Sequence, residues 1–293
     1  MYIISLFKRI FRLSNIGTLI FFLLNAFVII GVFAQSSPEY VWNIAALYLV
    51  SVLISLSPIG EWVLGLMSGA RKLKRVDMKS RLVPIVTRVH NKALERTPGM
   101  TRVIKLKVLY DSNPNAFALG RHTVCITEGL MSLSDDKIEG IIAHEIGHLA
   151  CHHTVIQLLI GGGNFIITLA LFLVRMVAGI MTFIGALFSF SRNDVAHGCG
   201  CIFSIVGVIS SLLVLLWTKF CMLFLMWSSR ANEYVADKYA MDIGYGYELA
   251  AALDAISDTA PRSSLLKALY STHPPTHDRI ARLQELGVPY YRY

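Results

Sequence analysis

The sequence predicts an α+β fold that is mainly helical, in which about four transmembrane helices form two hairpins and a charged domain is divided between two stretches of chain. Two observations lead to this prediction. First, 55% of the 293 residues are hydrophobic, a high share for a water-soluble chain. Second, the apolar residues gather in four blocks that are almost free of charge, at 13–38, 41–70, 154–191 and 195–229. Each block exceeds the roughly 20 residues that a helix needs to cross the hydrocarbon core.

The first two blocks predict an N-terminal membrane hairpin within residues 1–70. Basic residues precede the first block at 8–12 and follow the second at 71–81, whereas the connection between the blocks has no lysine or arginine. Because lysine and arginine concentrate on the cytoplasmic side, both ends of this hairpin are expected in the cytoplasm. Val32-Phe33-Ala34 also resembles the small-residue pattern that precedes a signal-peptide cleavage site, but the length of the block and the second block that follows it favour a retained anchor.

The net charge indicates which partners the chain binds, and the cysteines indicate whether it has disulfides or a cysteine-bound metal. The net charge of +8 is explained by membrane orientation and by nearby anionic lipid head groups. The basic residues are not interleaved with aromatic ones, so the lipid bilayer is expected as a partner and nucleic acid is not. Five cysteines, an odd number, indicate no disulfide framework. The segment 197–201 has one residue between its two cysteines, which is not a zinc spacing, so we interpret it as part of the turn of the second membrane hairpin.

Two charged stretches remain outside the apolar blocks, at 71–153 and 228–293. Hydrophobic periodicity predicts helices and strands in them. The helices are expected at 80–96, 230–241, 247–257 and 276–286, and the strands at 103–110 and 116–126, the second of these at a sheet edge. Because the apolar segment 154–227 crosses the membrane twice, both stretches emerge on the same side and can form one domain.

A further helix is predicted around the sequence His-Glu-x-x-His at 144–148. Ser134 suits its N-cap, two aspartates follow in the first turn, and isoleucines recur with helical spacing. Residues four apart share one helix face, so His144 and His148 can hold one Zn²⁺ ion while Glu145 activates a bound water. Solvated surface side chains are the alternative interpretation of so short a motif.

Such a zinc site needs a third protein ligand, with the fourth position left open for water. Glu233 is the best candidate because Asp237 lies four residues later on the same helix face. One carboxylate can bind the cation while the other accepts a hydrogen bond from a ligand histidine. Two acidic groups at this spacing repel each other, and a bound cation removes that cost. A solvated helix surface, with Arg230 as an ion-pair partner, is the alternative.

The ordered motifs of the chain resemble those of the HtpX-type membrane metalloproteases, relatives of the CAAX prenyl proteases. The first is the His-Glu-x-x-His segment with its preceding alanine, at 143–148. The others lie at 230–237 and at 271–280, where Thr-His-Pro-Pro occurs, and Asn-Ala-Phe-Ala at 115–118 also matches a segment of that family. The resemblance covers nearly the whole chain, including both membrane hairpins.

The resemblance implies a role for each matching residue. His144, His148 and Glu233 would bind one Zn²⁺ ion per chain. Glu145 would be the general base, taking a proton from zinc-bound water and later donating one to the leaving amine. Asp237 would orient a ligand histidine through a hydrogen bond.

Substrate-contacting residues are implied in the same way. Asn115, Ala116, Phe117 and Ala118 would present an edge strand to which an extended polypeptide adds backbone hydrogen bonds. His273 would stabilise the tetrahedral oxyanion, although a purely structural turn accounts for Thr-His-Pro-Pro equally well.

Three other polar residues near these motifs are expected to lie outside the reaction. Arg279 is expected to pair with a carboxylate of the domain. His152 shares a helix face with His148 but lies too far from His144 to join it on one ion. Solvent or lipid head groups are the expected surroundings of His152 and His153.

The resemblance implies an integral membrane zinc endopeptidase of the bacterial inner membrane, with its N-terminus and catalytic domain in the cytoplasm. Its substrates would be misfolded or damaged membrane proteins, cleaved as quality control under stress. We divide the chain into membrane hairpins at 1–70 and 154–227 and two parts of a catalytic domain at 71–153 and 228–293. The alternatives are a catalytically silent membrane scaffold or chaperone, and a prenyl-protein protease.

Overall fold

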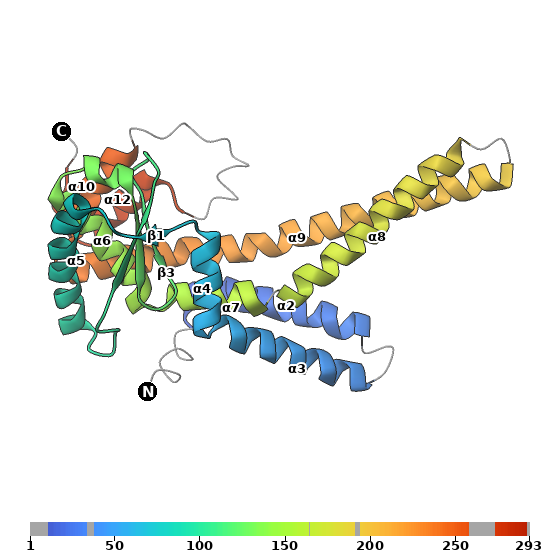
Figure 1. The fold of residues 1–293 in the computed structure, drawn as a ribbon, viewed down its shortest axis with the longest axis horizontal. Helices are drawn as coiled ribbons and strands as arrows, with labels where there is room; N and C mark the ends of the chain where they lie inside the picture. The colour runs from blue at the N-terminus through green and yellow to red at the C-terminus, as the bar shows by residue number, and fades with distance from the viewer. Residues whose placement is uncertain (1–10, 34–37, 164, 191–193, 258–272, 292–293) are drawn as a thin grey trace.

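A computed structural model describes residues 11–33, 38–163, 165–190, 194–257 and 273–291. A domain of helices and one small sheet lies at one end of the molecule, and a long helical hairpin extends away from it (Figure 1). The α-helices are α2 (Ile16–Phe33), α3 (Pro38–Ser55), α4 (Pro58–Met67), α5 (Val76–Arg96), α6 (Asp135–Ala150), α7 (His153–Gly163), α8 (Phe165–Ser189), α9 (Asp194–Asp242), α10 (Gly246–Ser257) and α12 (Thr276–Glu285). The strands are β1 (Arg71–Lys72), β2 (Lys105–Leu109), β3 (Ala116–Leu119) and β4 (Thr123–Thr127). The structure is therefore mainly helical with a few strands, as predicted.

The sheet has the order β1-β2-β4-β3, with β2 and β4 parallel and the other neighbours antiparallel. The expectation of one strand over 116–126 was wrong, because the chain reverses at Gly120 and forms the hairpin β3–β4. Gly120 has a φ of 60°, a left-handed conformation that glycine adopts without a steric penalty. The reversal leaves β4 buried inside the sheet and β3 at its edge.

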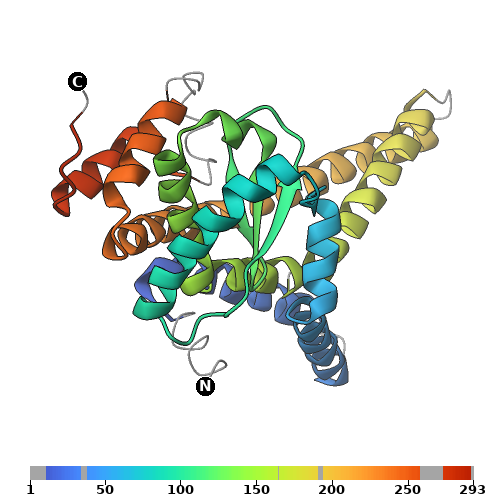
Figure 2. The same ribbon diagram turned by 60° about the vertical axis from the view of Figure 1, so that its left-hand side comes forward.

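Helix α6 occupies the centre of the domain, where it packs against α5, α9, α10 and strand β3 (Figure 2). Ile138, Ile142 and Ile146 are fully buried, which confirms that the isoleucine spacing marks a core face. Gly140 permits the approach of α10, because a Cβ at this position would lie 2.7 Å from the carbonyl oxygen of Glu248. The helix that carries the His-Glu-x-x-His motif is thus held on several sides.

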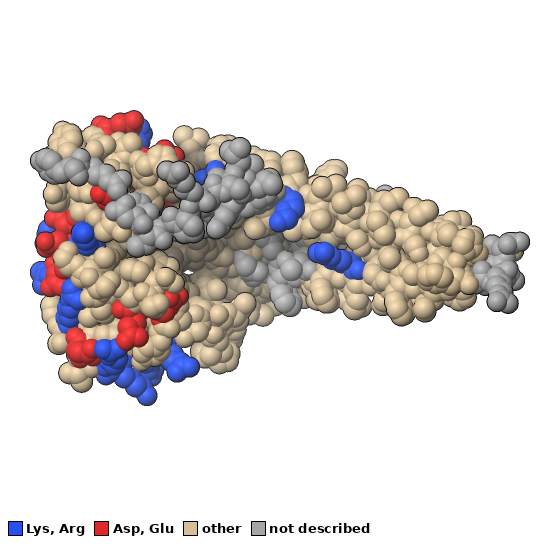
Figure 3. Space-filling model, turned by 90° about the horizontal axis from the view of Figure 1, so that it is seen from above, with Lys and Arg blue, Asp and Glu red and all other residues tan. Residues whose placement is uncertain are grey.

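The helices α8 and α9 are each long and apolar enough to cross a membrane. In the part of the chain that the structure describes, the pair Ala45–Ser55 and Pro58–Met67 would count as a third span if taken together, and the apolar helix Leu13–Val28 is shorter. Charged side chains gather over the domain, whereas the surface of the hairpin is almost free of them (Figure 3). The molecule is therefore a membrane protein with two or three candidate spans among the described residues, and the expected count of four stays a prediction.

The second apolar block is not one straight helix, because α3 and α4 meet at an angle of 71°. Ser57 accepts a hydrogen bond from the backbone N–H of Ile59 at 3.1 Å, and Pro58 begins the new helix without an N–H of its own. Glu61, the one charged residue of the block, accepts a hydrogen bond from the backbone N–H of Arg121 at 2.9 Å. The bend therefore turns α4 toward the β3–β4 turn.

The turn of the second hairpin is shorter than the sequence suggested. Helix α8 ends at Ser189 and α9 begins at Asp194, so the segment 197–201 is already helical rather than part of the turn. The ring of His197 contacts the carbonyl oxygen of Ser189 at 2.5 Å, across the turn. The cysteine-containing segment thus has a structural position at the end of the hairpin.

Small residues bring α8 and α9 together. A Cβ at Gly207 would lie 2.6 Å from the carbonyl oxygen of Ala178, whereas a Cβ at Gly179 would meet nothing within 4 Å. Close packing of small residues is a common way in which membrane helices associate.

Gly207→Leu is expected to destabilise the hairpin by about 1–3 kcal/mol, since overpacking forces the two helices apart. Heat-induced loss of folded protein in detergent micelles measures the effect, and Gly179→Leu is the matched control on the open side of α8. Equal midpoints for the two variants would contradict the packing seen here.

Candidate metal centre

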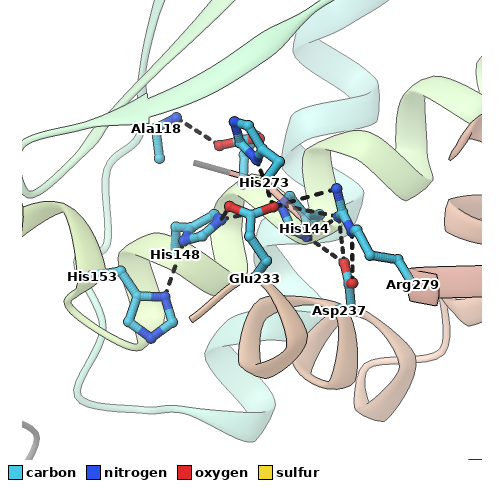
Figure 4. A network of polar contacts seen from close by, with 9 residues as sticks. Ala118, His144, His148, His153, Glu233, Asp237, His273 and Arg279 are labelled. Atoms are coloured by element: carbon cyan, nitrogen blue, oxygen red, sulfur yellow. Dashed lines mark hydrogen bonds and ion pairs between the residues drawn. The ribbon is translucent and has the colours of Figure 1, made fainter. Parts of the chain in front are cut away.

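Three side chains from two distant segments converge in the domain (Figure 4). His144 and His148 project from one face of α6, and Glu233 faces them from α9. The Nε2 atoms of the histidines lie 3.1 Å apart. Glu233 places Oε1 at 3.3 Å from Nε2 of His148 and Oε2 at 3.5 Å from Nε2 of His144. The group is one that could hold a metal ion.

The spacing of these atoms suits a metal ion held by the two histidines and one oxygen of Glu233. One ligand atom from each of the three residues can be chosen so that all of them lie within 4.8 Å of one another. Bonds of about 2.0–2.1 Å to a tetrahedral Zn²⁺ would bring neighbouring ligand atoms to roughly 3.3–3.4 Å. When the histidines are neutral, as metal binding through Nε2 requires, the buried carboxylates of Glu145, Glu233 and Asp237 and the guanidinium of Arg279 leave the cluster with two surplus negative charges. A divalent cation would neutralise that surplus, so the residues present fit the ion.

Asp237 and Arg279 lie behind the histidine side of the group. Asp237 places Oδ1 at 2.8 Å from Nδ1 of His144, the ring nitrogen that faces away from Glu233. Arg279 donates two hydrogen bonds to this carboxylate, from Nε at 2.8 Å and Nη2 at 2.6 Å. Burial alone would lower the pKa of Arg279, but the charge of Asp237 and the hydrogen bonds to it raise the pKa above its usual range. The expectation that Arg279 pairs with a carboxylate is confirmed.

Arg279→Met is expected to lower the free energy of unfolding by about 3–5 kcal/mol, because the variant leaves the buried Asp237 without its charged partner. Urea unfolding of the metal-free protein in detergent measures the change. Arg282→Met is the control, since this arginine lies on the same helix but pairs with Glu285 at the surface, where such a pair contributes at most about 1 kcal/mol. Similar losses for both variants would contradict a buried ion pair.

Glu145 lies beside the candidate ligands and points toward the edge strand. Its Oε2 accepts a hydrogen bond from the backbone N–H of Ala118 at 2.6 Å. In an antiparallel ladder, every second residue turns its backbone N–H and C=O groups away from the neighbouring strand. The backbone groups of Ala116 and Ala118 therefore point outward from the free edge of β3. The structure therefore brings Glu145 and this edge together. Asn115 instead donates its backbone N–H to Oγ1 of Thr127.

His273 reaches the group from the segment that precedes α12. Its Nδ1 lies 2.9 Å from Oε2 of Glu233, and 64% of its side chain is exposed. The structure thus places this histidine next to a candidate ligand and at the surface, while Ser271 and Thr272 of the same motif lie outside the described residues. A role toward an oxyanion stays a prediction.

One residue at the centre was missed by sequence reasoning. His153 is only 3% exposed, and its Nδ1 lies 3.0 Å from Nδ1 of His148. The expectation that it meets solvent or head groups was wrong. Burial, together with the adjacent His148, lowers the pKa of His153 well below its ordinary value. A helical projection points to His152 as the neighbour of His148, and only the helix end at Cys151 could have signalled that the next histidine turns inward.

Comparison with known proteins agrees with this arrangement. Residues 85–287 match peptidase family M48. A protease HtpX homolog of Thermococcus sibiricus is 32% identical over 62% of this chain and 68% of its own length. A protease HtpX homolog of Tropheryma whipplei is 32% identical over 76% of this chain and 77% of its own.

The crystal structure of S. mikatae Ste24p has the same fold, with a TM-score of 0.52 and 19% identity. It aligns with 96% of this chain, which spans 65% of the length of Ste24p. The family match includes α6 and the segment of α9 that faces it, so the geometry and the sequence comparison concern the same residues. We conclude that this chain belongs to peptidase family M48 and is a membrane metalloprotease of the HtpX type.

Proposed function

We propose that this chain is a zinc-dependent endopeptidase that cleaves misfolded or damaged membrane proteins at the cytoplasmic face of a bacterial inner membrane, as quality control. The observation that carries the proposal is the convergence of His144, His148 and Glu233 beside Glu145, next to a sheet edge that faces outward. This arrangement offers a metal position, a base and a surface for an extended polypeptide within one domain.

The course of α9 supports the proposed domain division. We assign membrane hairpins to 1–70 and 154–227 and the catalytic domain to 71–153 and 228–293. Helix α9 runs without a break from the apolar hairpin to Glu233, so the ligand stays at a fixed distance from the membrane. Substrates anchored in the same bilayer are thereby concentrated near the site.

The proposed mechanism gives roles to three buried residues beside the candidate metal position, Glu145, Asp237 and Arg279. When bound, the ion would act as a Lewis acid for the peptide carbonyl and the attacking water. Glu145 accepts the proton of the attacking water at Oε2 and returns it to the nitrogen of the leaving amine. Asp237 holds the ring of His144 through Nδ1, and Arg279 keeps that carboxylate ionised and in place.

Substrate binding is assigned to the outer edge of β3. Ala118 offers its N–H, which Glu145 accepts in the structure described here, and an incoming strand would take over this donor. In the same proposal Asn115, Ala116 and Phe117 extend the edge along the substrate. His273 donates a hydrogen bond to the developing oxyanion from its exposed ring.

Ala118→Pro is expected to lower kcat/KM for a polypeptide about tenfold, because one backbone hydrogen bond is worth about 0.5–1.5 kcal/mol and proline has no N–H. Steady-state cleavage of a labelled substrate measures the change. Ala118→Val is the control because it keeps the N–H. Equal losses for the two variants would argue against edge-strand binding.

The function itself is tested with purified protein in liposomes that contain a model membrane protein, either folded or destabilised by mutation. The proposal predicts faster cleavage of the destabilised form, a weak reaction with the same segment as a soluble peptide, and loss of product with a zinc chelator. Cleavage that requires a prenyl group would instead favour a prenyl-protein protease. Absence of product despite bound zinc would favour a scaffold.

A further inference from the structure

The feature without a role in the proposed mechanism is the buried ring of His153. It lies against the back of His148, with the ring centroids 5.1 Å apart and the planes at 70° (Figure 4). The two Nδ1 atoms are 3.0 Å apart, which is hydrogen-bond distance. His153 is not near enough to the candidate ligand atoms to share their ion, since it contacts His148 through the nitrogen on the opposite side of the ring from the metal position.

The direction of this hydrogen bond follows from the contacts of His148. Its Nε2 faces Nε2 of His144 and Oε1 of Glu233, so a ligand role requires a free lone pair at Nε2. A neutral imidazole has one N–H, which must then be at Nδ1. His148 therefore donates, and His153 accepts through its own Nδ1. His144 donates in the same way to Asp237, so each histidine has its own partner behind the ring.

The backbone is built to put His153 in this position. Helix α6 ends at Ala150 and α7 begins at His153, and between them His152 has a φ of 60°, the one positive value recorded for a non-glycine residue in the described chain. A left-handed conformation costs a non-glycine residue about 1–2 kcal/mol. The turn is held nonetheless, because the carbonyl of His152 accepts the N–H groups of Val155 and Ile156, both at 3.1 Å. This break between the two helices places the next side chain, that of His153, against His148.

We propose that His153 is a positioning residue of the metal centre, accepting the Nδ1–H of His148 and thereby fixing the tautomer and ring rotation that turn Nε2 toward His144 and Glu233. The inference rests on the proposed metal role of His148. Partners behind a ligand histidine typically contribute 10–100-fold to metal affinity.

The test is a titration of the metal-free full-length protein in detergent with Co²⁺, whose absorption reports both affinity and ligand geometry, followed by competition with Zn²⁺. His153→Leu removes the acceptor, and His153→Asn restores one, since Oδ1 of asparagine can occupy the place of Nδ1. His90→Leu is the matched control, because His90 is also buried and bonds the carbonyl oxygen of Thr101 at 2.8 Å, away from the centre. His148→Ala tests the ligand role itself.

We expect His153→Leu to weaken Co²⁺ binding about 10–100-fold and to alter its spectrum, His153→Asn to recover most of both, and His90→Leu to change neither. Unchanged affinity in His153→Leu, with binding lost in His148→Ala, would overturn the inference alone. If His153→Leu and His153→Asn weaken binding equally, or if His90→Leu weakens it as much, the effect comes from packing and not from the hydrogen bond. Either result would also overturn the inference. Normal binding by His148→Ala would instead overturn the proposed metal site.

Discussion

Glu145→Gln is expected to lower kcat by about 10²–10⁴-fold, the range that a positioned acid–base group contributes, while the protein keeps its metal. Glutamine has the same shape and can still accept the N–H of Ala118 through its amide oxygen, so the edge strand stays in place. Unlike the carboxylate of Glu145, an amide cannot accept a proton from the attacking water. Loss of this proton transfer is therefore the expected cause of the lower kcat. Kinetics on the liposome-embedded substrate, with metal content measured on the same preparation, give the result.

The control for this variant lies on the same helix. Glu139→Gln changes a carboxylate of α6 that pairs with Arg88 at the domain surface, away from the candidate centre. We expect it to cleave at the natural rate. A Glu145→Gln protein that turns over substrate as fast as Glu139→Gln would remove the general-base assignment, whatever its metal content.

Glu233→Gln is expected to reduce metal affinity by more than the 10–100-fold typical of an outer hydrogen-bond partner, and to bring peptidase activity to background. The change replaces an anionic ligand with a neutral amide in a buried site and removes one of the two surplus negative charges. Metal content after dialysis against a weak chelator measures the first effect, and substrate cleavage measures the second.

The outcome for Glu233→Gln can be separated from loss of fold. Asp242→Asn, in the last turn of the same helix, removes a carboxylate that pairs with Lys238 and Arg96 outside the centre and should retain metal. A Glu233→Gln protein that keeps stoichiometric zinc and full activity would exclude this residue as the third ligand and leave the two histidines in need of another.

The elements with strong local signals agree with the sequence to within a few residues. The helix expected at 247–257 is Gly246–Ser257, the one expected at 276–286 is Thr276–Glu285, and the strand expected at 103–110 is Lys105–Leu109. Hydrophobic periodicity and capping residues act over a few turns, so they can be read without knowledge of the fold. The residues expected to form a helix at 230–241 are helical, but they are the last turns of α9, which begins at Asp194. Their expected start at 230 was wrong, because the apolar hairpin and this segment form one continuous helix.

The sequence by itself determined the apolar blocks, the amphipathic zinc-motif helix and the ordered motifs of an HtpX-type protease, because each depends on residue type and spacing within one segment. Only the tertiary structure decided that β3 faces Glu145, that α4 turns toward the β3–β4 turn, and that His153 rather than His152 lies behind His148. These features depend on where a helix stops and on which distant segment packs against it. Both depend on how the whole chain packs and buries its apolar surface. The spacing of residues within one segment carries no information about this packing.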